Sequence, residues 1–211
     1  MAGTGPVRLT RIAPFALAAA LAAAGAALFG QGLYLSAKAE VAQLLLNRAW
    51  DRSVQSHTAA KPWPWADTWP VARLSAPRLK QSAVVLAEAG GEAMAFGPAH
   101  LSQTPQPGAP GVSVIAAHRD SHFAFLKDLK AGDTLVLETG DGQKAFKVTG
   151  FEVVDHQASG IHPDGGPPRL ALVTCYPFGA MQPGPLRYVV WAEPEPEPAR
   201  TARPAARRKA S

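Results

Sequence analysis

The chain has 211 residues, of which 47% are hydrophobic and 8% aromatic, so it can form a core of ordinary size and is not a disordered chain. Its formal net charge is +5, but the excess lies near the two ends, because residues 12–192 carry 14 basic and 13 acidic side chains. A nearly neutral body excludes the broad basic surface with which proteins bind nucleic acid.

An uncharged segment separates Arg11 from Lys38, and residues 12–36 are mostly Ala, Leu and Phe. About 20 apolar residues cross a bilayer, so this segment can act as a transmembrane signal-anchor. The basic residues before it predict that residues 1–11 lie in the cytoplasm and that the body lies on the extracytoplasmic side of the membrane. The alternative is a cleaved signal peptide, since small residues near position 37 offer a cleavage site, although the apolar run is longer than such signals usually have.

Residues 37–70 are expected to form a stalk. Val41, Leu44, Leu45 and Ala49 recur at helical spacing, so the helix of the anchor is predicted to continue. Prolines exclude a helix from the Trp- and Pro-rich connector at residues 61–70. Its tryptophans fit either a membrane interface or an apolar face of the domain, and we favour packing on the domain.

The body, residues 71–193, has an all-β pattern of short runs rich in Val and Leu, separated by turn residues. A hairpin turn is predicted at residues 140–142, and a helical stretch at residues 121–129. Because the connections are too short for repeated helical crossovers, the pattern predicts a closed or partly closed β-barrel. The expected strands are 73–77, 81–88, 112–117, 134–138, 144–154, 169–174 and 187–192. Residues 194–211 alternate Pro with Glu and then turn basic, which is typical of a disordered tail.

Cys175 is the only cysteine, and it ends an apolar run that reads as a strand. It cannot form an internal disulfide, so it is either an inert small apolar residue or a reactive thiol. In an oxidising compartment an unused free thiol is a liability. The sequence therefore favours a functional thiol if the chain also supplies suitable partners.

A histidine is the usual partner of a reactive thiol, because an imidazolium stabilises a thiolate. His118 directly follows the apolar run at residues 112–117, where a barrel presents polar side chains to a groove. His100 lies in a loop that can border such a site. His57 lies in the stalk region, and His156 and His162 lie in a polar stretch rich in turn residues; all three are expected to be solvated.

Three short segments occur in a recognisable order: Ala117-His118-Arg119-Asp120, Leu172-Val173-Thr174-Cys175 and Leu186-Arg187-Tyr188. They resemble the histidine, TLxTC and arginine motifs of the sortase family, and the resemblance covers about residues 71–193. The continuation Cys175-Tyr176-Pro177-Phe178 and the Trp63-to-Asp67 connector look most like the class found in Gram-negative bacteria.

The resemblance implies a membrane-anchored cysteine transpeptidase. Cys175 is then the nucleophile that attacks an LPxTG-like sorting signal near the C-terminus of an exported protein, and an amine, whose identity the sequence does not give, receives the product. His118 is the implied acid and base, and Arg187 the oxyanion or substrate ligand. Thr174, Asp120 and His100 are implied as supporting residues. The mechanism needs no cofactor or metal.

Other function classes stay open on the sequence alone. A cysteine-dependent L,D-transpeptidase also suits a β-rich envelope protein, but it typically has a Ser-x-Gly-Cys pattern. A non-enzymatic, membrane-tethered binding module is a second alternative. A third is a metal site that uses His118 and His122 at i, i+4, which requires both to lie on one helix.

Overall fold

The computed structural model describes residues 9–196; the expected cytoplasmic residues 1–8 and most of the expected disordered tail, residues 197–211, lie outside them. The chain divides into two compact units between Leu45 and Leu46. The first contains most of one long helix, and the second contains the end of that helix and all the strands.

The helix α1, Leu9–Ser56, is continuous, so the predicted anchor and the first part of the predicted stalk form one helix. Large apolar side chains along it are more than half exposed: Leu17, Leu21, Leu28, Phe29 and Leu33. By length and composition, Ala16–Ser56 includes a segment able to cross a membrane. A signal sequence near an N-terminus meets the same criteria, so both readings of this segment persist.

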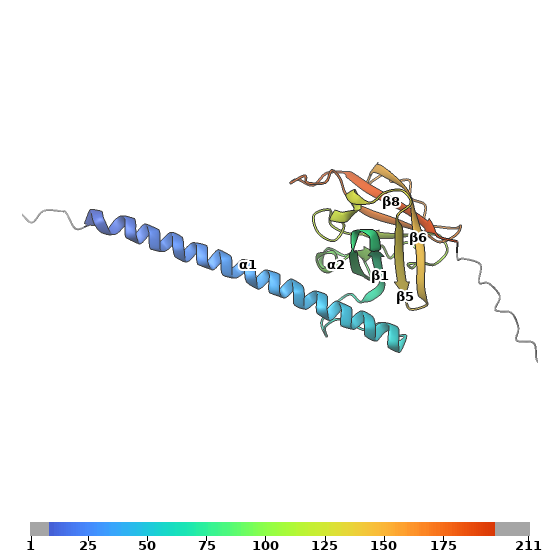
Figure 1. Ribbon diagram of the computed structural model, residues 1–211, viewed down its shortest axis with the longest axis horizontal. Coiled ribbons are helices and arrows are strands. Elements are labelled where there is room, and N and C mark those ends of the chain that lie inside the picture. Colours follow the sequence, from blue (N-terminus) through green and yellow to red (C-terminus); the bar gives the residue numbers. More distant parts are fainter. Residues whose placement is uncertain (1–8, 197–211) are drawn as a thin grey trace, which may run out of the picture. The chain divides into compact units, whose positions relative to one another are not determined.

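The second unit is a closed barrel of eight strands, which confirms the predicted fold class (Figure 1). The strands lie in the order β1-β2-β3-β4-β7-β8-β6-β5 around the barrel. Their bounds are Pro70–Ala76 (β1), Gln81–Leu86 (β2), Ala99–His100 (β3), Val112–Ala116 (β4), Thr134–Thr139 (β5), Gly142–Asp155 (β6), Arg169–Cys175 (β7) and Leu186–Pro194 (β8). Closure leaves no long sheet edge free to pair with another chain.

The barrel is mixed, because β2 pairs with β3 and β4 pairs with β7 in parallel, while the other neighbours are antiparallel. The connection from β4 to its parallel neighbour β7 runs through β5 and β6 and contains no α-helix. Such a connection satisfies the length that a parallel crossover requires. The predicted hairpin turn is present between β5 and β6, where Gly142 has a positive φ of 120°.

Three short elements differ from the prediction. The two-residue strand β3, the helix α2 (Gly91–Phe96) and the 3-10 helix η1 (Pro77–Leu79) have no expected counterpart. The helical stretch expected at residues 121–129 is only a 3-10 helix, η2, Ala124–Asp128. These elements are too short for a periodic apolar pattern to reveal them.

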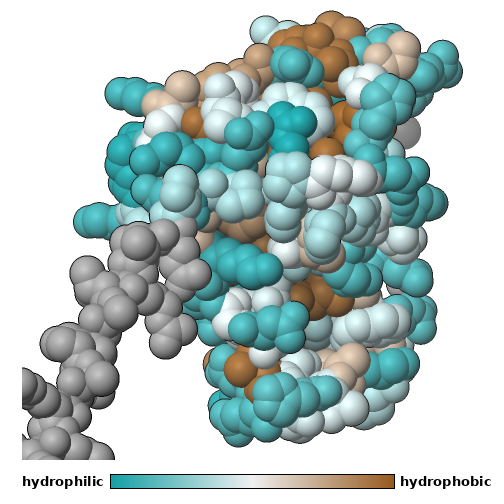
Figure 2. Space-filling view, turned by 90° about the vertical axis from the view of Figure 1, so that its right-hand side faces the viewer, coloured by the Kyte–Doolittle hydropathy of each residue, from teal (hydrophilic) through white to brown (hydrophobic). Residues whose placement is uncertain are grey.

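Alternating side chains of the strands fill the barrel, among them Leu135, Phe146, Leu172 and Val190, all with no exposed surface. Phe123, just before η2, is also fully buried in this core. The opposite side chains face outward. Figure 2 shows one face of the barrel on which polar residues predominate and apolar residues form small separate patches, as expected of a surface in water.

A second apolar cluster joins the end of α1 to the barrel, with Leu46 0% and Trp50 2% exposed against Val84 and Leu86 of β2. The connector that follows is not helical, as predicted. Its Trp63 packs edge-on against Phe96, with ring centroids 5.2 Å apart, which confirms packing on the domain for this side chain.

Trp65 behaves differently. It is 79% exposed, so the expectation of packing on the domain is wrong for this residue. Residues 63–66 form a turn, in which the Ala66 N–H donates to the Trp63 carbonyl at 3.0 Å. The chain changes direction between the two tryptophans, so Trp65 does not follow Trp63 onto the domain.

Candidate active site

The three residues expected to carry the chemistry lie at the ends of three neighbouring strands, β4, β7 and β8. Cys175 is the last residue of β7 and is the register partner of Arg187 in β8. On the other side of β7, Ala116 of β4 is the partner of Val173, and the Ala117 N–H donates to the Val173 carbonyl at 3.2 Å. His118 therefore follows the last bonded position beside Cys175, on a chain segment about 4.8 Å away.

Side-chain alternation places these residues on one face of the sheet. Leu172 of β7 and Val190 of β8 point into the barrel core, whereas Val173 and Val189 belong to a cluster on the outer face. Since alternate residues of a strand share a face, Cys175 and Arg187 lie on the outer face. The same count along β4 brings His118 to that face.

Thr174 holds the segment that carries His118. Its side chain is 2% exposed, and its Oγ1 donates to the Ala117 carbonyl at 2.7 Å. The residue before Cys175 is thus bonded to the residue before His118. This bond couples the two strand ends.

The Cys175 thiol is half-buried, and His118 is exposed. His122 lies close enough to His118 to interact with it electrostatically. Burial lowers the pKa of His122, and His118 lowers it further, although a hydrogen bond with the backbone of Ala95 opposes the shift. His122 is therefore mostly neutral at neutral pH.

Arg187 is half-buried, and its Nη1 donates to the carbonyls of Gly184 and Leu186 at 2.8 and 2.9 Å. These bonds hold the guanidinium against its own hairpin. Within residues 9–196 its Nε and Nη2 make no hydrogen bond, so they remain available to a ligand at the strand end.

Arg119 was not assigned a function from the sequence, but it connects the two sides of the site. Its Nη2 donates to the carbonyls of Ala180 and Gln182 in the connection between β7 and β8, the second at 2.9 Å. The residue after His118 thus tethers the loop that follows Cys175. Its position beside His118 was the only signal in the sequence, because its partners lie more than 60 residues away.

Aromatic side chains support the hairpin that carries Cys175 and Arg187. Tyr188 stacks on Tyr176 and meets Phe178 edge-on, with ring centroids 6.2 and 5.2 Å apart. Burial raises the pKa of Tyr188, and Tyr176 raises it further, so its hydroxyl stays protonated at neutral pH. The cluster stabilises the base of the β7–β8 connection.

Two supporting candidates lack contact with these residues. Asp120 is exposed and makes no hydrogen bond or ion pair within the part of the chain that the structure describes. His100 is 2% exposed, and its Nε2 lies 2.9 Å from the Pro105 carbonyl and 3.1 Å from Thr104 Oγ1. These contacts fix the loop after β3. The catalytic support expected of both residues stays a prediction.

His118 and His122 do not share the helix that a metal site at i, i+4 requires, because His118 lies in irregular chain after β4 and His122 lies in the turn before η2. Among the described residues no group of three or more His, Cys, Asp and Glu could hold a metal ion. The histidines expected to be solvated, His57, His156 and His162, are all exposed.

Residues 74–195 match the family model of the sortase domain, which is more than half of the chain. The chain belongs to the sortase family. It is also 25% identical over 121 residues to sortase D of Bacillus subtilis, a match that covers 57% of this chain and 61% of that protein. The chain thus matches less than two thirds of that relative's length.

Solved sortase structures share the fold. Sortase C-1 from Actinomyces oris is 26% identical, with a TM-score of 0.55 over 61% of this chain and 76% of that one. A pilus-related sortase C of Group B Streptococcus is also 26% identical, with a TM-score of 0.55 over 60% and 68%. Sortase A from Corynebacterium diphtheriae, 21% identical, has a TM-score of 0.57 over 64% and 65% and shows the fold alone.

Proposed function

We propose that the chain is a cysteine transpeptidase that cleaves an LPxTG-like sorting signal of exported proteins and transfers the product to an amine. The observation that carries the proposal is the meeting of Cys175, Arg187 and the His118 segment at neighbouring strand ends of a sortase-family barrel. A non-enzymatic binding module does not account for a half-buried thiol beside these two residues.

The reaction has two steps. In the first, Cys175 Sγ forms a bond to the carbonyl carbon of the scissile peptide, the C–N bond breaks, and His118 passes the thiol proton to the leaving amine. In the second, an acceptor amine attacks the thioacyl carbon, and His118 returns the amine proton to the thiol. An amide forms in place of the thioester, so no oxidant or hydrolytic water is consumed.

Arg187 is the oxyanion ligand in this mechanism. Its free Nε and Nη2 can donate to the carbonyl oxygen as negative charge develops on it. The planar guanidinium presents its N–H donors in a fixed fork, which suits an oxygen that gains negative charge. Thr174 holds the segment before His118, and Arg119 holds the β7–β8 connection, while the acyl group is transferred.

We further propose a location. Residues 12–36 cross the inner membrane, residues 1–11 lie in the cytoplasm, and the catalytic barrel at residues 71–193 lies on the periplasmic side. The apolar, exposed side chains of α1 and the basic residues before it support this arrangement. The Tyr176-Pro177 continuation after the nucleophile supports the Gram-negative class.

The deciding experiment traps the thioacyl intermediate. The full chain, solubilised in detergent, is incubated with a peptide that contains an LPxTG-like signal and is analysed by mass spectrometry. We expect an adduct on the tryptic peptide that contains Cys175, and release of the C-terminal fragment. Cys175→Ala abolishes both, whereas the exposed-site control Ser82→Ala retains both.

Two further treatments separate the alternatives. Alkylation of the thiol stops cleavage, and a zinc chelator leaves it unchanged. Full cleavage by Cys175→Ala contradicts the proposal, and loss of cleavage on chelation alone favours a metal-dependent mechanism.

A further inference from the structure

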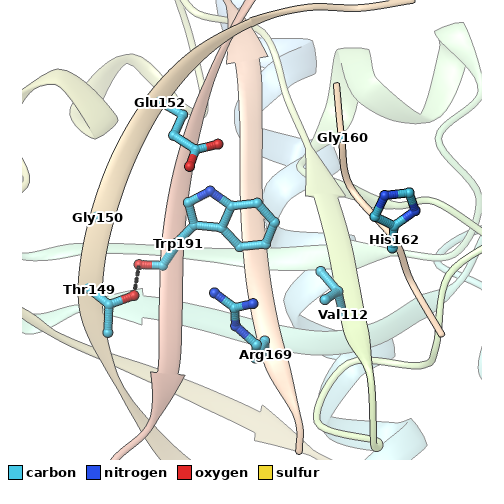
Figure 3. A pocket seen from close by; sticks show the side chains of 8 residues that line it. All are labelled: Val112, Thr149, Gly150, Glu152, Gly160, His162, Arg169 and Trp191. Carbon is cyan, nitrogen blue, oxygen red and sulfur yellow. Dashed lines mark hydrogen bonds between the residues drawn. The ribbon is translucent and has the colours of Figure 1, made fainter. Parts of the chain in front are cut away.

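A second concave site lies on the outer face of the same sheet, at the opposite end of β7 from Cys175. The pocket has a volume of about 440 Å³, within the usual range for small-molecule sites (Figure 3). Four neighbouring strands and the β6–β7 connection supply its lining: Val112, Thr149, Gly150, Glu152, Gly160, His162, Arg169 and Trp191.

The pocket is separate from the proposed catalytic site. Arg169 and Cys175 are the first and last residues of β7, so about 20 Å of strand separates them. Between them, Ala171 and Val189 have no exposed surface and belong to an apolar cluster that Ile161 also covers. A ligand in the pocket therefore does not occupy the thiol.

The indole of Trp191 forms one wall of the pocket. The guanidinium of Arg169 lies over its ring, 4.8 Å from the centroid, and pairs with Glu193 at 3.2 Å. Figure 3 shows Glu152 and Arg169 flanking the indole, with His162 across the cavity from it. Apolar ring surface and polar groups thus face the same space.

The backbone makes room for a ligand here. Gly150 and Gly160 add no side chain to the pocket, and a Cβ at either position would meet nothing within 4 Å. The pairing of β6 with β8 shifts register between Val148 and Gly150, which marks a β-bulge or a similar irregularity beside the pocket. Bulges of this kind often lie beside functional sites.

The charges exclude most ligand classes. Arg169 is compensated by Glu193, and Glu152 makes no ion pair among the described residues, so a phosphate or other strong anion is repelled. A small cation is also excluded, because the Arg169 guanidinium at the pocket carries the same charge. A peptide strand finds no free ladder position, because the backbone of β6, β8 and β7 is paired in the closed barrel. The remaining class is a neutral ligand with an apolar ring face and many hydroxyl groups.

We propose that this pocket binds a saccharide of one or two sugar rings. The apolar C–H face of a sugar ring packs on the part of the Trp191 indole that lines the pocket, beside the Arg169 guanidinium, and its hydroxyl groups bond Glu152, Arg169 and His162. Binding at this site holds the barrel on a glycan while the reaction proceeds elsewhere on the same sheet.

Isothermal titration of the full chain in detergent with chitotriose, the N-acetylglucosamine trimer, tests the proposal. We expect saturable binding, weakened about tenfold or more in Glu152→Gln, which loses a charged hydrogen-bond acceptor. His162→Ala, at an exposed position, weakens binding without altering the fold. The matched control Asp141→Asn, an exposed turn residue outside the pocket, binds as the unmodified chain does.

Binding that persists in Cys175→Ala supports a site independent of the transpeptidase reaction, so the two proposals can fail separately. No heat of binding with chitotriose or with maltotriose at millimolar concentration overturns the proposal. Saturable binding of triglycine, and not of the sugars, also overturns it and identifies a peptide site. Equal affinity of Glu152→Gln, His162→Ala and the unmodified chain for the sugar overturns it as well.

Discussion

At the scale of single residues, Thr174 couples the two halves of the candidate active site. Its hydroxyl is the hydrogen-bond donor to the Ala117 carbonyl, and it is buried. Valine has the same shape but no hydroxyl, so it leaves that carbonyl without its partner. The cost of an unpaired buried polar group is larger than the net contribution of an ordinary hydrogen bond.

We predict that Thr174→Val lowers the free energy of unfolding by about 1–3 kcal/mol. It also lowers kcat/KM for peptide cleavage by about tenfold to a hundredfold, because His118 loses its fixed position. Denaturant unfolding and peptide turnover measure the two effects. Thr174→Ser, which keeps the hydroxyl, retains most of the stability and of the turnover. The control Thr134→Val, on β5, changes neither quantity by a comparable amount. Full turnover by Thr174→Val rules out the positioning function.

At the scale of elements, Arg119 tethers the β7–β8 connection to the turn after β4. The charged donor bonds two loop carbonyls, and hydrogen bonds to charged groups each contribute about 1.5–3 kcal/mol. We predict that Arg119→Ala loosens this connection while the strands remain paired. The rate of hydrogen–deuterium exchange at the backbone amides of residues 176–186 then rises about tenfold or more, because the lost hydrogen bonds no longer oppose local opening.

Arg119→Lys distinguishes a tether from a general charge effect. Lysine keeps the charge but not the planar fork, so it restores only part of the protection. Arg48→Ala, at an exposed position of α1, leaves exchange of the fragment unchanged. Equal uptake by the unmodified chain and Arg119→Ala contradicts the tether.

A second connection between elements depends on pH. Arg78 of η1 donates through Nε and Nη2 to the two carboxylate oxygens of Asp133, both at 2.6 Å, just before β5. The hydrogen bond with Arg78 is the largest cause that lowers the pKa of Asp133, and a bond from the Lys130 N–H adds to it. A lowered carboxyl pKa contributes stability above the unfolded pKa, and this contribution is lost as pH falls through the folded pKa.

We therefore predict that Arg78→Ala lowers the melting temperature at pH 7 and that the difference from the unmodified chain shrinks as the pH falls below about 4, the ordinary aspartate range. Thermal unfolding followed from pH 7 to pH 2 measures this convergence. Lys80→Ala, beside it and exposed, serves as the control. A difference that stays constant across this range assigns the effect to lost packing and not to the ion pair.

At the scale of the whole molecule, the all-β barrel was predictable because strand alternation and turn residues are local signals. Seven of the eight strands were expected near their observed bounds. The strand that was not expected, β3, has only two residues, too few to show an alternation of apolar and polar side chains. The parallel pairing of β4 with β7 joins strands more than 50 residues apart, which no local pattern specifies.

The candidate site shows the same division. The sequence supplied Cys175, His118 and Arg187 through their motifs, and each lies at the expected strand end. It did not supply Arg119 as a tether, since that function depends on carbonyls of a distant loop. The pocket beside Trp191 was also missed, because its lining comes from four strands that become neighbours only when the barrel closes.

The end of α1 belongs to the barrel unit although it continues a helix that can cross a membrane. Leu46 has no exposed surface and packs with β2, whereas Leu44, two residues earlier, is 50% exposed. Residues two positions apart lie on different faces of a helix. The pair therefore provides a matched test of whether this turn of the helix stabilises the barrel.

We predict that Leu46→Ala lowers the free energy of unfolding by about 2–5 kcal/mol, the cost of a cavity in a packed core. Leu44→Ala changes it by less than about 0.5 kcal/mol, as expected of an exposed position. Urea unfolding of the full chain in detergent, followed by near-ultraviolet circular dichroism, measures both. Similar effects of the two substitutions contradict a helix end that is integral to the barrel. A large effect of Leu46→Ala alone means that the end of α1 is part of the folded domain, so a shortened chain that lacks this turn of the helix loses stability.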